Sequence, residues 1–349
     1  MFLDSLFLLA LVLSVSIMCA AYTPRVLVIG STGRLGRVVT SKLIARGVEV
    51  VALVRDLESA KTVEELKGAT LREGDILDVE SLKVATSQVD SVVDVHGVKP
   101  PRFIKLGDLF RAPRENDSTH PYNINYKGTR NLLEAMKMNK NKKLIRLTGA
   151  LVGASAFKPF VALFNFLLSY SNKWHQLSEK LIRESGVDYT VVRPSEIADE
   201  PSAVAQTYPP LGEAVNARYL MAVPGDSEKR DPIPVPSKIS KYDVADLCVE
   251  AAIKAQPGYL SKSTVICCSQ AGDGPRTFDE IFGDSATMKS FIDTKAIVPG
   301  KHGAATVVYS AVVSGVVAMV FQGTKSLFNT MLRMVARVVA ATKATGGFF

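Results

Sequence analysis

The stretch "RVLVIGSTGRLGRVVTSKLIARGVEVVALVRD" (residues 25–56) decides the fold of this 349-residue chain. An apolar run at 26–29 enters a glycine-rich turn, and a helical spacing of apolar residues follows as far as Gly47. A second apolar run occupies residues 48–54. A strand, a helix and a second strand in this order predict a β-α-β unit, the repeating element of a parallel sheet.

The glycines of the turn predict a dinucleotide site. Gly30 permits the tight turn, Gly33 lets the backbone approach a pyrophosphate, and Gly36 permits close packing of the helix. The start of the helix offers unpaired N–H groups to the phosphates. We therefore expect this turn to contact the cofactor through Gly30, Thr32, Gly33, Arg34, Leu35 and Gly36.

The end of the second strand indicates which cofactor is bound. An acidic residue there would hold the ribose 2′-hydroxyl of NAD, whereas an arginine suits the 2′-phosphate of NADP. Arg55 occupies that place, and Arg34 could assist it from the glycine turn. Asp56 follows Arg55 directly and argues in the other direction. NADP, bound as NADPH, is therefore the expected cofactor, and NAD is the less favoured one.

Further α/β repeats follow the first unit. The quoted segments are "ATLREGDILD" (69–78), "VDSVVDVHG" (89–97), "NYKGTRNLLEAMK" (125–137), "KKLIRLTG" (142–149) and "VDYTVVRPS" (187–195). Their alternation predicts an α/β fold with a doubly wound parallel sheet. Asp75 and Ile76 would flank an adenine after the third strand. His96, at the end of the fourth strand, would border the nicotinamide ribose, although a structural histidine is the alternative.

These segments together resemble the atypical short-chain dehydrogenase/reductases, in particular the NmrA-like NAD(P)H-binding group. The resemblance rests on "GSTGRLG", "GDILD", "NYKGTRNLLEAMK", "SGVDYTVVRP" and "ISKYDVADLCVEAA" (239–252), and it covers roughly residues 25–270. It implies a Rossmann domain over 23–275 that includes a small C-terminal substrate-side lobe at about 195–240. Plant relatives of this type are often plastid proteins, and some attach to membranes through extra C-terminal sequence.

The resemblance also implies a tyrosine and, four residues later, a lysine that lowers the pKa of the tyrosine phenol. Glu179 fixes the register of the family's active-site helix, and this places Ser171 in the tyrosine slot and His175 in the lysine slot. Thr148 takes the place of an upstream serine that orients the substrate. The candidate catalytic residues are therefore His175, Thr148 and Ser171. His175 titrates near neutral pH and could act as an acid; the alternative is a surface histidine.

Two segments could define a ligand. The apolar stretch "ASAFKPFVALFNFLLSY" (154–170) could line a pocket for a lipophilic substrate such as an isoprenoid, a pigment precursor or a quinone. It could equally form a core helix or dip into a membrane surface. The loop at 99–123 is long for a connection in a compact domain, and such loops are usually functional or mobile.

Charge and cysteine content exclude other classes of protein. The formal net charge is +8, but once the five basic residues of 301–349 and Asp4 are set aside, residues 23–300 carry only about +4. This is too mild to argue for nucleic acid as a partner. The four cysteines show neither a disulfide framework nor metal spacing, and we expect no metal site.

Both ends of the chain look like targeting or membrane segments. Residues 1–22 are apolar and end in "CAAY", which suits a signal segment that leads to a plastid or the endomembrane system; an uncleaved anchor is the alternative. A linker is expected at 276–302. Residues 303–324 are uncharged and predict a transmembrane or buried helix. Residues 325–343 predict a basic amphipathic helix on a membrane surface, or a helix packed on the domain.

Two functions remain open from the sequence. The first is an oxidoreductase that uses NADP(H) on a lipophilic small molecule at a membrane, with an unusual proton donor or none. The second is a catalytically silent NADP(H)-binding redox sensor or assembly factor, tethered to a membrane by its tail and bound to a protein partner. The missing Tyr-Lys pair favours the second function, and the apolar stretch at 154–170 favours the first.

Overall fold

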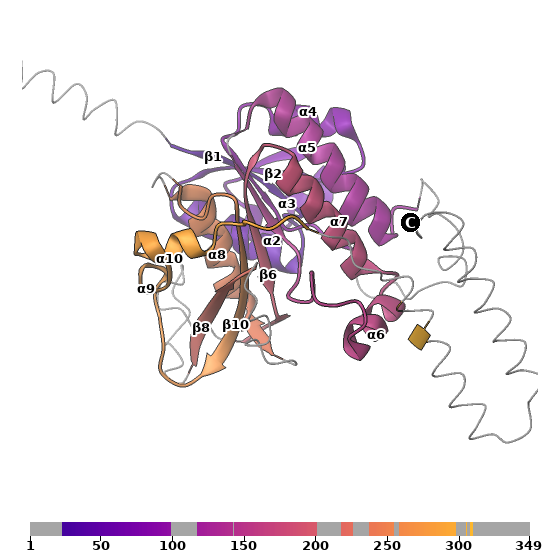
Figure 1. Ribbon diagram of the computed structural model, residues 1–349. Coiled ribbons are helices and arrows are strands. Elements are labelled where there is room, and N and C mark those ends of the chain that lie inside the picture. The colour runs from indigo at the N-terminus through magenta and orange to yellow at the C-terminus, as the bar shows by residue number, and fades with distance from the viewer. Residues whose placement is uncertain are drawn as a thin grey trace, which may run out of the picture.

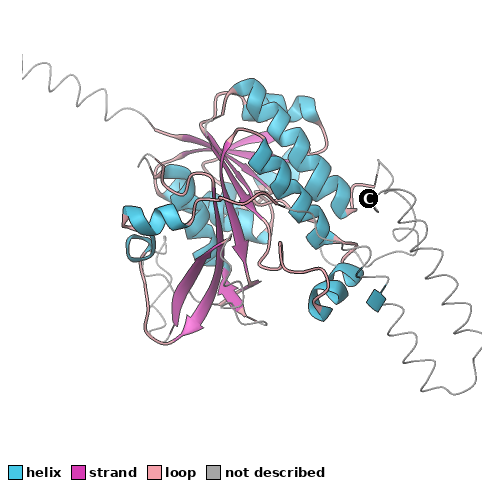
Figure 2. Ribbon diagram, viewed as in Figure 1, coloured by secondary structure: helices cyan, strands magenta, loops and turns pink. Residues whose placement is uncertain are grey.

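A computed structural model describes residues 23–98, 117–141, 143–200, 218–225, 237–254 and 258–297, together with 305, 308 and 309. An eight-stranded sheet lies at its centre with the strand order β3-β2-β1-β4-β5-β6-β10-β8 (Figures 1 and 2). Its strands are β1 (Arg25–Ile29), β2 (Glu49–Val54), β3 (Thr70–Glu73), β4 (Ser91–Asp94), β5 (Lys143–Leu147), β6 (Asp188–Pro194), β8 (Arg218–Pro224) and β10 (Ser263–Ala271). Every neighbouring pair is parallel except β10 with β8.

Helices cover both faces of the sheet. The first four are α2 (Arg34–Ala45), α3 (Leu57–Lys61), α4 (Val79–Thr86) and α5 (Gly128–Asn139), the last preceded by the π-helical segment η3 (Tyr122–Lys127). The others are α6 (Pro159–Leu167), α7 (Ser171–Glu184), α8 (Lys241–Ile253), α9 (Phe278–Phe282) and α10 (Ser285–Ser290), and η1 (Glu64–Leu66) is a single 3-10 turn. The prediction of a doubly wound, mainly parallel α/β sheet is confirmed.

Alternation along β1 explains the two layers. Val26 and Val28 belong to the apolar core shared with α2 and α8. Leu27 and Ile29 belong to the opposite core, shared with α4, α5 and α7. Successive side chains of a strand point to opposite faces of a sheet, so an uninterrupted apolar run is what a doubly covered strand requires. The strand order reverses between β1 and β4, where α/β sheets of this kind bind their ligands.

The segment expected to form a substrate-side lobe is divided. β7 (Glu196–Ala198) and β9 (Lys238–Ser240) form a separate two-stranded parallel sheet. β8, which lies between them in sequence, instead joins the edge of the main sheet beside β10. The described part of residues 195–240 therefore contributes both to the main sheet and to a small sheet beside it.

Residues 276–297, expected to lie in a linker, are folded onto the domain. α9 begins with a capping box formed by Thr277 and Glu280. Phe278, Phe282 and Phe291 are buried in the core shared with α8. These buried aromatic residues place residues 276–297 inside the fold.

The three segments predicted at the chain ends lie almost entirely outside the described residues. This holds for the whole of 1–22 and 325–343 and for 303–324 except residues 305, 308 and 309. Residues 99–116 of the long loop lie outside the described residues as well. Within the described ranges, no helix has the length and apolar content needed to cross a bilayer.

Candidate functional site

The glycine turn after β1 has the geometry that a dinucleotide requires. Gly30 has a φ of +82°, and a Cβ atom there would lie 2.9 Å from the backbone of His96. A Cβ atom on Gly36 would lie 2.0 Å from the carbonyl oxygen of Gly30. Any side chain at these two positions would collide with backbone. The turn is closed by the Gly33 amide, which donates to the Gly30 carbonyl oxygen at 2.9 Å.

The N-terminus of α2 is open to a phosphate. Its N-cap residue is Gly33, and no side chain caps the helix. Thr32, Gly33 and Arg34 are exposed, whereas Leu35 packs into the core. The backbone N–H groups of the first helical turn are therefore free of side-chain acceptors. A pyrophosphate fits this turn, both in the space left by the glycines and in the donors offered.

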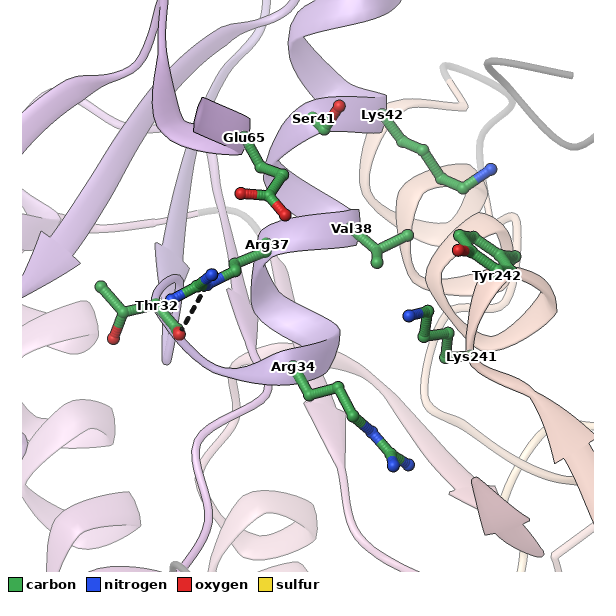
Figure 3. Close-up of a pocket in the computed structure, with 9 residues that line it drawn as sticks. All are labelled: Thr32, Arg34, Arg37, Val38, Ser41, Lys42, Glu65, Lys241 and Tyr242. Atoms are coloured by element: carbon green, nitrogen blue, oxygen red, sulfur yellow. Dashed lines mark hydrogen bonds between the residues drawn. The ribbon is translucent and has the colours of Figure 1, made fainter. Parts of the chain in front are cut away.

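The basic residues near the turn have different partners. Arg34 bonds to the carbonyl oxygen of Ile197 and lies 3.6 Å from Asp199, so its side chain reaches the small sheet. Arg37 donates from Nε to the carbonyl oxygen of Thr32 at 3.1 Å (Figure 3). Arg37, which the sequence analysis did not single out, lines a cavity of about 570 Å³ along α2, together with residues of η1 and α8. That cavity contains none of the predicted catalytic residues.

Arg55 and Asp56, which follow β2, have separate roles. Arg55 is exposed. Asp56 is the N-cap of α3, and its carboxylate accepts hydrogen bonds from the backbone N–H and the hydroxyl of Ser59 at 3.1 and 2.6 Å. These hydrogen bonds lower the pKa of Asp56. The acidic residue that argued for NAD is thus engaged in capping a helix.

The residues expected to flank an adenine are placed differently from each other. Asp75 follows β3 and accepts from the Leu77 backbone N–H at 2.8 Å, which shapes the loop. Ile76 is 8% exposed and packs in the core beside Gly128, where a Cβ atom would lie 2.7 Å from it. Asp75 is therefore partly exposed, whereas Ile76 is buried.

A buried charged cluster holds His96 beside the glycine turn. Asp94 and Arg146 are fully buried, and Nη1 of Arg146 lies 3.1 Å from the Asp94 carboxylate. The same Nη1 donates to the His96 carbonyl oxygen, and His96 Nε2 donates to the Ile124 carbonyl oxygen at 2.9 Å. Burial alone would raise the pKa of Asp94, but Arg146 and His96 hold it below the ordinary value. His96 is therefore held in place beside the glycine turn.

A second pocket, of about 380 Å³ and mostly apolar, contains the three predicted catalytic residues. Thr148 reaches it from the end of β5, and Ser171 and His175 reach it from α7. Phe164 of α6 and Ile197 of β7 contribute apolar walls. The structure thus brings together residues far apart in sequence at the carboxyl edge of the parallel strands.

Asn125 links two of these residues and was missed by sequence reasoning. It is 1% exposed, and its Nδ2 donates to Ser171 Oγ at 3.3 Å and to His175 Nε2 at 3.1 Å. It lies in η3, and π-helical turns occur often at functional sites. Asn125 is the first residue of the segment "NYKGTRNLLEAMK", but its distance along the chain from Ser171 and His175 gave no sign of this contact.

The hydrogen bond from Asn125 sets the tautomer of His175. Because Nε2 accepts, the ring proton is on Nδ1, which is buried and has no hydrogen-bond partner among the described residues. The pKa of His175 lies well below its ordinary value, first because of burial and then because of the charges of Arg146 and His96. His175 is therefore neutral at physiological pH, with its Nδ1–H buried, which contradicts the expectation that it acts as an acid near neutral pH.

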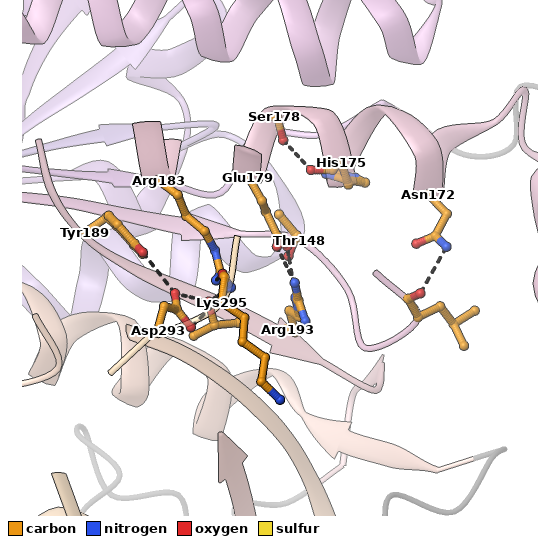
Figure 4. Close-up of polar contacts among 12 residues, drawn as sticks. Thr148, Asn172, His175, Ser178, Glu179, Arg183, Tyr189, Arg193, Asp293 and Lys295 are labelled. Carbon is orange, nitrogen blue, oxygen red and sulfur yellow. Dashed lines mark hydrogen bonds and ion pairs between the residues drawn. The ribbon is translucent and has the colours of Figure 1, made fainter. Parts of the chain in front are cut away.

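Thr148 is tied to a buried ion pair. Its hydroxyl donates to Glu179 Oε1 at 2.7 Å, and Arg193 Nε donates to the same oxygen at 3.0 Å (Figure 4). Glu179 and Arg193 are 0% and 1% exposed. The Thr148 hydroxyl therefore donates its proton to the hydrogen bond with Glu179, and only the lone pairs of its oxygen are available to a ligand.

Neither tyrosine nor lysine lines this pocket among the residues that the structure describes. Tyr170 is the N-cap of α7 and has a φ of 58°. Lys173 stacks on Trp174 with its Nζ 4.7 Å from the ring, and burial lowers its pKa to about 8. The departure from the family's Tyr-Lys pair is therefore a feature of the site itself.

Comparisons with known proteins agree with this geometry. Residues 30–255 match the model of a family described as NAD(P)H-binding. An uncharacterized chloroplastic protein of Arabidopsis thaliana is 26% identical over 270 residues, which cover 75% of this chain and 83% of that protein. The range 30–255 contains the whole glycine turn and the three predicted catalytic residues, Thr148, Ser171 and His175.

Shorter matches concern proteins with printed roles. The photosystem II assembly factor Ycf39 of Synechocystis is 29% identical over 169 residues, or 48% of this chain and 44% of that protein. The chloroplastic divinyl chlorophyllide a 8-vinyl-reductase of Arabidopsis thaliana is 27% identical over 177 residues, or 49% of this chain and 38% of that protein. Less than half the length of either protein is therefore matched.

A solved structure confirms the fold. A short-chain dehydrogenase/reductase from Veillonella parvula in complex with NADP superposes with a TM-score of 0.51 and 12% identity. The match covers 74% of this chain and 99% of that one.

Proposed function

Because this chain belongs to the NAD(P)H-binding family of atypical short-chain dehydrogenase/reductases, we propose that it is an NADP(H)-dependent oxidoreductase acting on a lipophilic small molecule. One observation carries the proposal. The glycine turn, His96 and an apolar pocket lined by Thr148, Ser171 and His175 lie at the same carboxyl edge of the sheet. In a doubly wound sheet this edge is where a nucleotide and its substrate meet.

The residues after β2 support NADP over NAD. The cofactor would be held by the N–H groups of the glycine turn and the start of α2. Arg55 is exposed at the end of β2 and is suited to a 2′-phosphate. Asp56 is committed to the N-cap of α3 and leaves no acidic side chain for the ribose hydroxyls at that point.

The pocket supports reduction of a neutral carbonyl compound or quinone. Bound NADPH supplies a hydride. The Ser171 hydroxyl, whose oxygen accepts a hydrogen bond from Asn125, would donate to the substrate oxygen, and the neutral His175 side chain lines the pocket beside it. A fixed hydroxyl donor stabilises developing negative charge on that oxygen. The proton that finally binds the oxygen comes from water, since His175 stays neutral.

The walls and the ends of the chain support a lipophilic substrate at a plastid membrane. The pocket is mostly apolar, which selects against charged substrates. Residues 303–324 are uncharged and 325–343 are basic and amphipathic, so the C-terminal tail would attach the protein to a membrane. Matches to chloroplastic proteins and the leader at 1–22 support location in a plastid.

A second function is favoured by one specific observation. The described lining of the pocket lacks the tyrosine and lysine that carry out proton transfer in the family. If no other group transfers the proton, the protein binds NADP(H) without turnover and acts as a redox sensor or as an assembly factor with a protein partner. The match to a photosystem II assembly factor supports this alternative.

Turnover of bound NADPH separates the two functions. The full-length protein is mixed with NADPH and a panel of lipophilic quinones, enones and aldehydes, and loss of the 340 nm absorbance is followed. An oxidoreductase oxidises NADPH with at least one acceptor, and the rate falls about 100-fold in Ser171→Ala while NADPH binding is kept. Tight NADPH binding without oxidation by any acceptor favours the sensor or assembly factor.

A further inference from the structure

Exposed apolar side chains gather at one end of the described molecule. The large hydrophobic residues exposed there include Leu163 at 53% and Phe164 at 38%, both on α6. Phe157, which precedes α6, is 47% exposed, and Val308 is also 47% exposed. We call these four residues the α6 rim. In Figure 1, α6 stands away from the sheet, next to the start of α7.

The α6 rim adjoins the apolar pocket through Phe164 and includes Val308 at the start of the tail. Phe164 belongs both to the rim and to the lining of the pocket that contains His175. The hydroxyl of Tyr309 donates to the carbonyl oxygen of Phe157 at 2.5 Å. Soluble domains expose such side chains singly as a rule, whereas a cluster beside a pocket marks an interaction site.

Charge identifies the kind of partner. Between Thr148 and Ser178 the sequence contains two lysines, Lys158 and Lys173, and no acidic residue. Lys158 is exposed at the N-cap of α6. The sequence from residue 310 onward has four Lys or Arg and no acidic residue either. Lys173 is packed on Trp174, and Glu196 lines the adjoining pocket, so Lys158 is the exposed charge within this stretch. Apolar side chains beside an exposed lysine, in a stretch of sequence without acidic residues, are complementary to the interface of an anionic bilayer.

The described residues 308 and 309 do not cover the rim. Val308 lies next to Tyr309, which bonds to Phe157, yet Val308 is itself 47% exposed and enlarges the apolar surface. α6 has nine residues, far fewer than the ~20 needed to cross the hydrocarbon core. Its side chains can therefore enter the interface only from one side.

We propose that the α6 rim docks on the surface of an anionic lipid bilayer and opens the apolar pocket toward the lipid. This contact is made by the folded domain, in addition to the proposed attachment through the tail. Only the second part of the inference, that a substrate enters from the lipid, rests on the proposed function. Docking itself requires no turnover.

A tryptophan probe tests the contact in the full-length protein. Trp174 is the one tryptophan of the chain and is buried. Replacing it in Trp174→Phe leaves a background into which Leu163→Trp is introduced. The matched control is Met138→Trp, since Met138 is 60% exposed on α5 and lies outside the rim. Each protein is mixed with phosphatidylcholine vesicles, with and without phosphatidylglycerol, and with brominated lipids that quench fluorescence within the bilayer.

The proposal predicts a blue shift and bromolipid quenching for the probe at 163 on anionic vesicles, and neither for the probe at 138. It also predicts that Leu163→Glu weakens vesicle binding about tenfold, while Met138→Glu leaves it unchanged. Vesicle binding without quenching at 163 would mean that the tail alone attaches, and would overturn the proposal. So would emission at 163 that is already blue-shifted without vesicles, because the chain itself or a second copy then covers the rim.

Absence of vesicle binding would overturn the proposal as well. NADPH titration of the same samples keeps the two ideas apart. Docking without NADPH binding contradicts the proposed function alone, and NADPH binding without docking contradicts the further inference alone.

Discussion

At the residue scale, His175 shows that the lysine slot of the family's helix can be filled without a charge. The residue is neutral, its Nε2 accepts from Asn125, and its Nδ1–H is buried. The same Asn125 amide donates to Ser171 Oγ, so the Ser171 hydroxyl is the donor that this arrangement can offer to a substrate. A donor of this kind stabilises charge on a substrate oxygen by position, not by proton transfer.

The protonation of His175 makes stability depend on pH. In the folded protein burial and Arg146 keep the pKa of His175 well below 6.5, whereas in the unfolded chain it titrates near ~6.5. Unfolding therefore takes up a proton in acid, and the stability contributed by neutral His175 is present above pH ~6.5 and is lost as the pH falls below it. We expect His175→Gln to reduce the slope of unfolding free energy against pH between about 6.5 and 5, by up to ~1.4 kcal/mol per pH unit. Urea unfolding at a series of pH values measures it, and equal slopes in both proteins would contradict the neutral state.

Arg55 is predicted to select NADPH. Arg55→Ala should weaken NADPH binding about tenfold and leave NADH binding unchanged, because only NADPH carries the 2′-phosphate. Fluorescence titration with both nucleotides measures the effect, and Lys61→Ala, an exposed lysine on α3, is the control. Equal losses for the two nucleotides would show that Arg55 does not contact the phosphate.

The sequence could indicate neighbours within one helix but not residues joined only by folding. Counting back from Glu179 places Ser171 and His175 on one face of α7, and Thr148 joins them in the pocket from the end of β5; their catalytic role stays a prediction. Asn125 lies 50 residues before His175 and in a π-helical segment. No spacing rule joins two such residues, so only the structure reveals their contact.

At the scale of elements, the glycine turn and α2 form one unit whose packing leaves no room for a methyl group. Gly36→Ala would place a Cβ atom 2.0 Å from the Gly30 carbonyl oxygen, so the turn or the helix must move. We expect a loss of more than about 2 kcal/mol in unfolding free energy and at least a tenfold loss of NADPH affinity. Gly97→Ala is the control, since nothing lies within 4 Å of a Cβ atom there. Thermal unfolding and NADPH titration test both effects, and wild-type behaviour of Gly36→Ala would refute the close packing.

The ion pair between α7 and β6 is predicted to stabilise the site only as a pair. Glu179→Gln leaves Arg193 buried without its carboxylate, and the expected cost is about 3–5 kcal/mol. The double variant Glu179→Met with Arg193→Met should lose less, because neither member of the pair is then left buried without its partner. Chemical unfolding of the three proteins provides the comparison, and a double variant that is less stable than Glu179→Gln would contradict the argument.

Short elements were the hardest to predict. β1, β5 and β6 follow from long apolar runs, because a strand covered on both faces needs such a run. α9 and α10 have five and six residues, too few for a helical period to show. Burial of Phe278 and Phe282 depends on contacts with α8, which lies far away in sequence.

At the scale of the whole molecule, the sheet explains why cofactor and substrate sites are neighbours. Strands β1, β4, β5 and β6 are adjacent and parallel, so the loops that follow them meet at one edge. Gly30, His96, Thr148 and Ser195 each follow one of these strands. The alternation of strands and helices in the sequence was sufficient to predict this edge. The place of β8 in the main sheet could not be predicted, because no sequence pattern distinguishes an antiparallel edge strand from a strand of a separate lobe.

The central claim is that this edge binds NADP(H), and titration of the full-length protein with NADPH and NADH tests it most directly. Nucleotide fluorescence, with Gly36→Ala as the disrupted protein and Gly97→Ala as the intact control, reports binding at the glycine turn. The account predicts saturable binding that is tighter for NADPH than for NADH, kept in Gly97→Ala and lost in Gly36→Ala. Absence of binding to either nucleotide by the folded wild-type protein would contradict it.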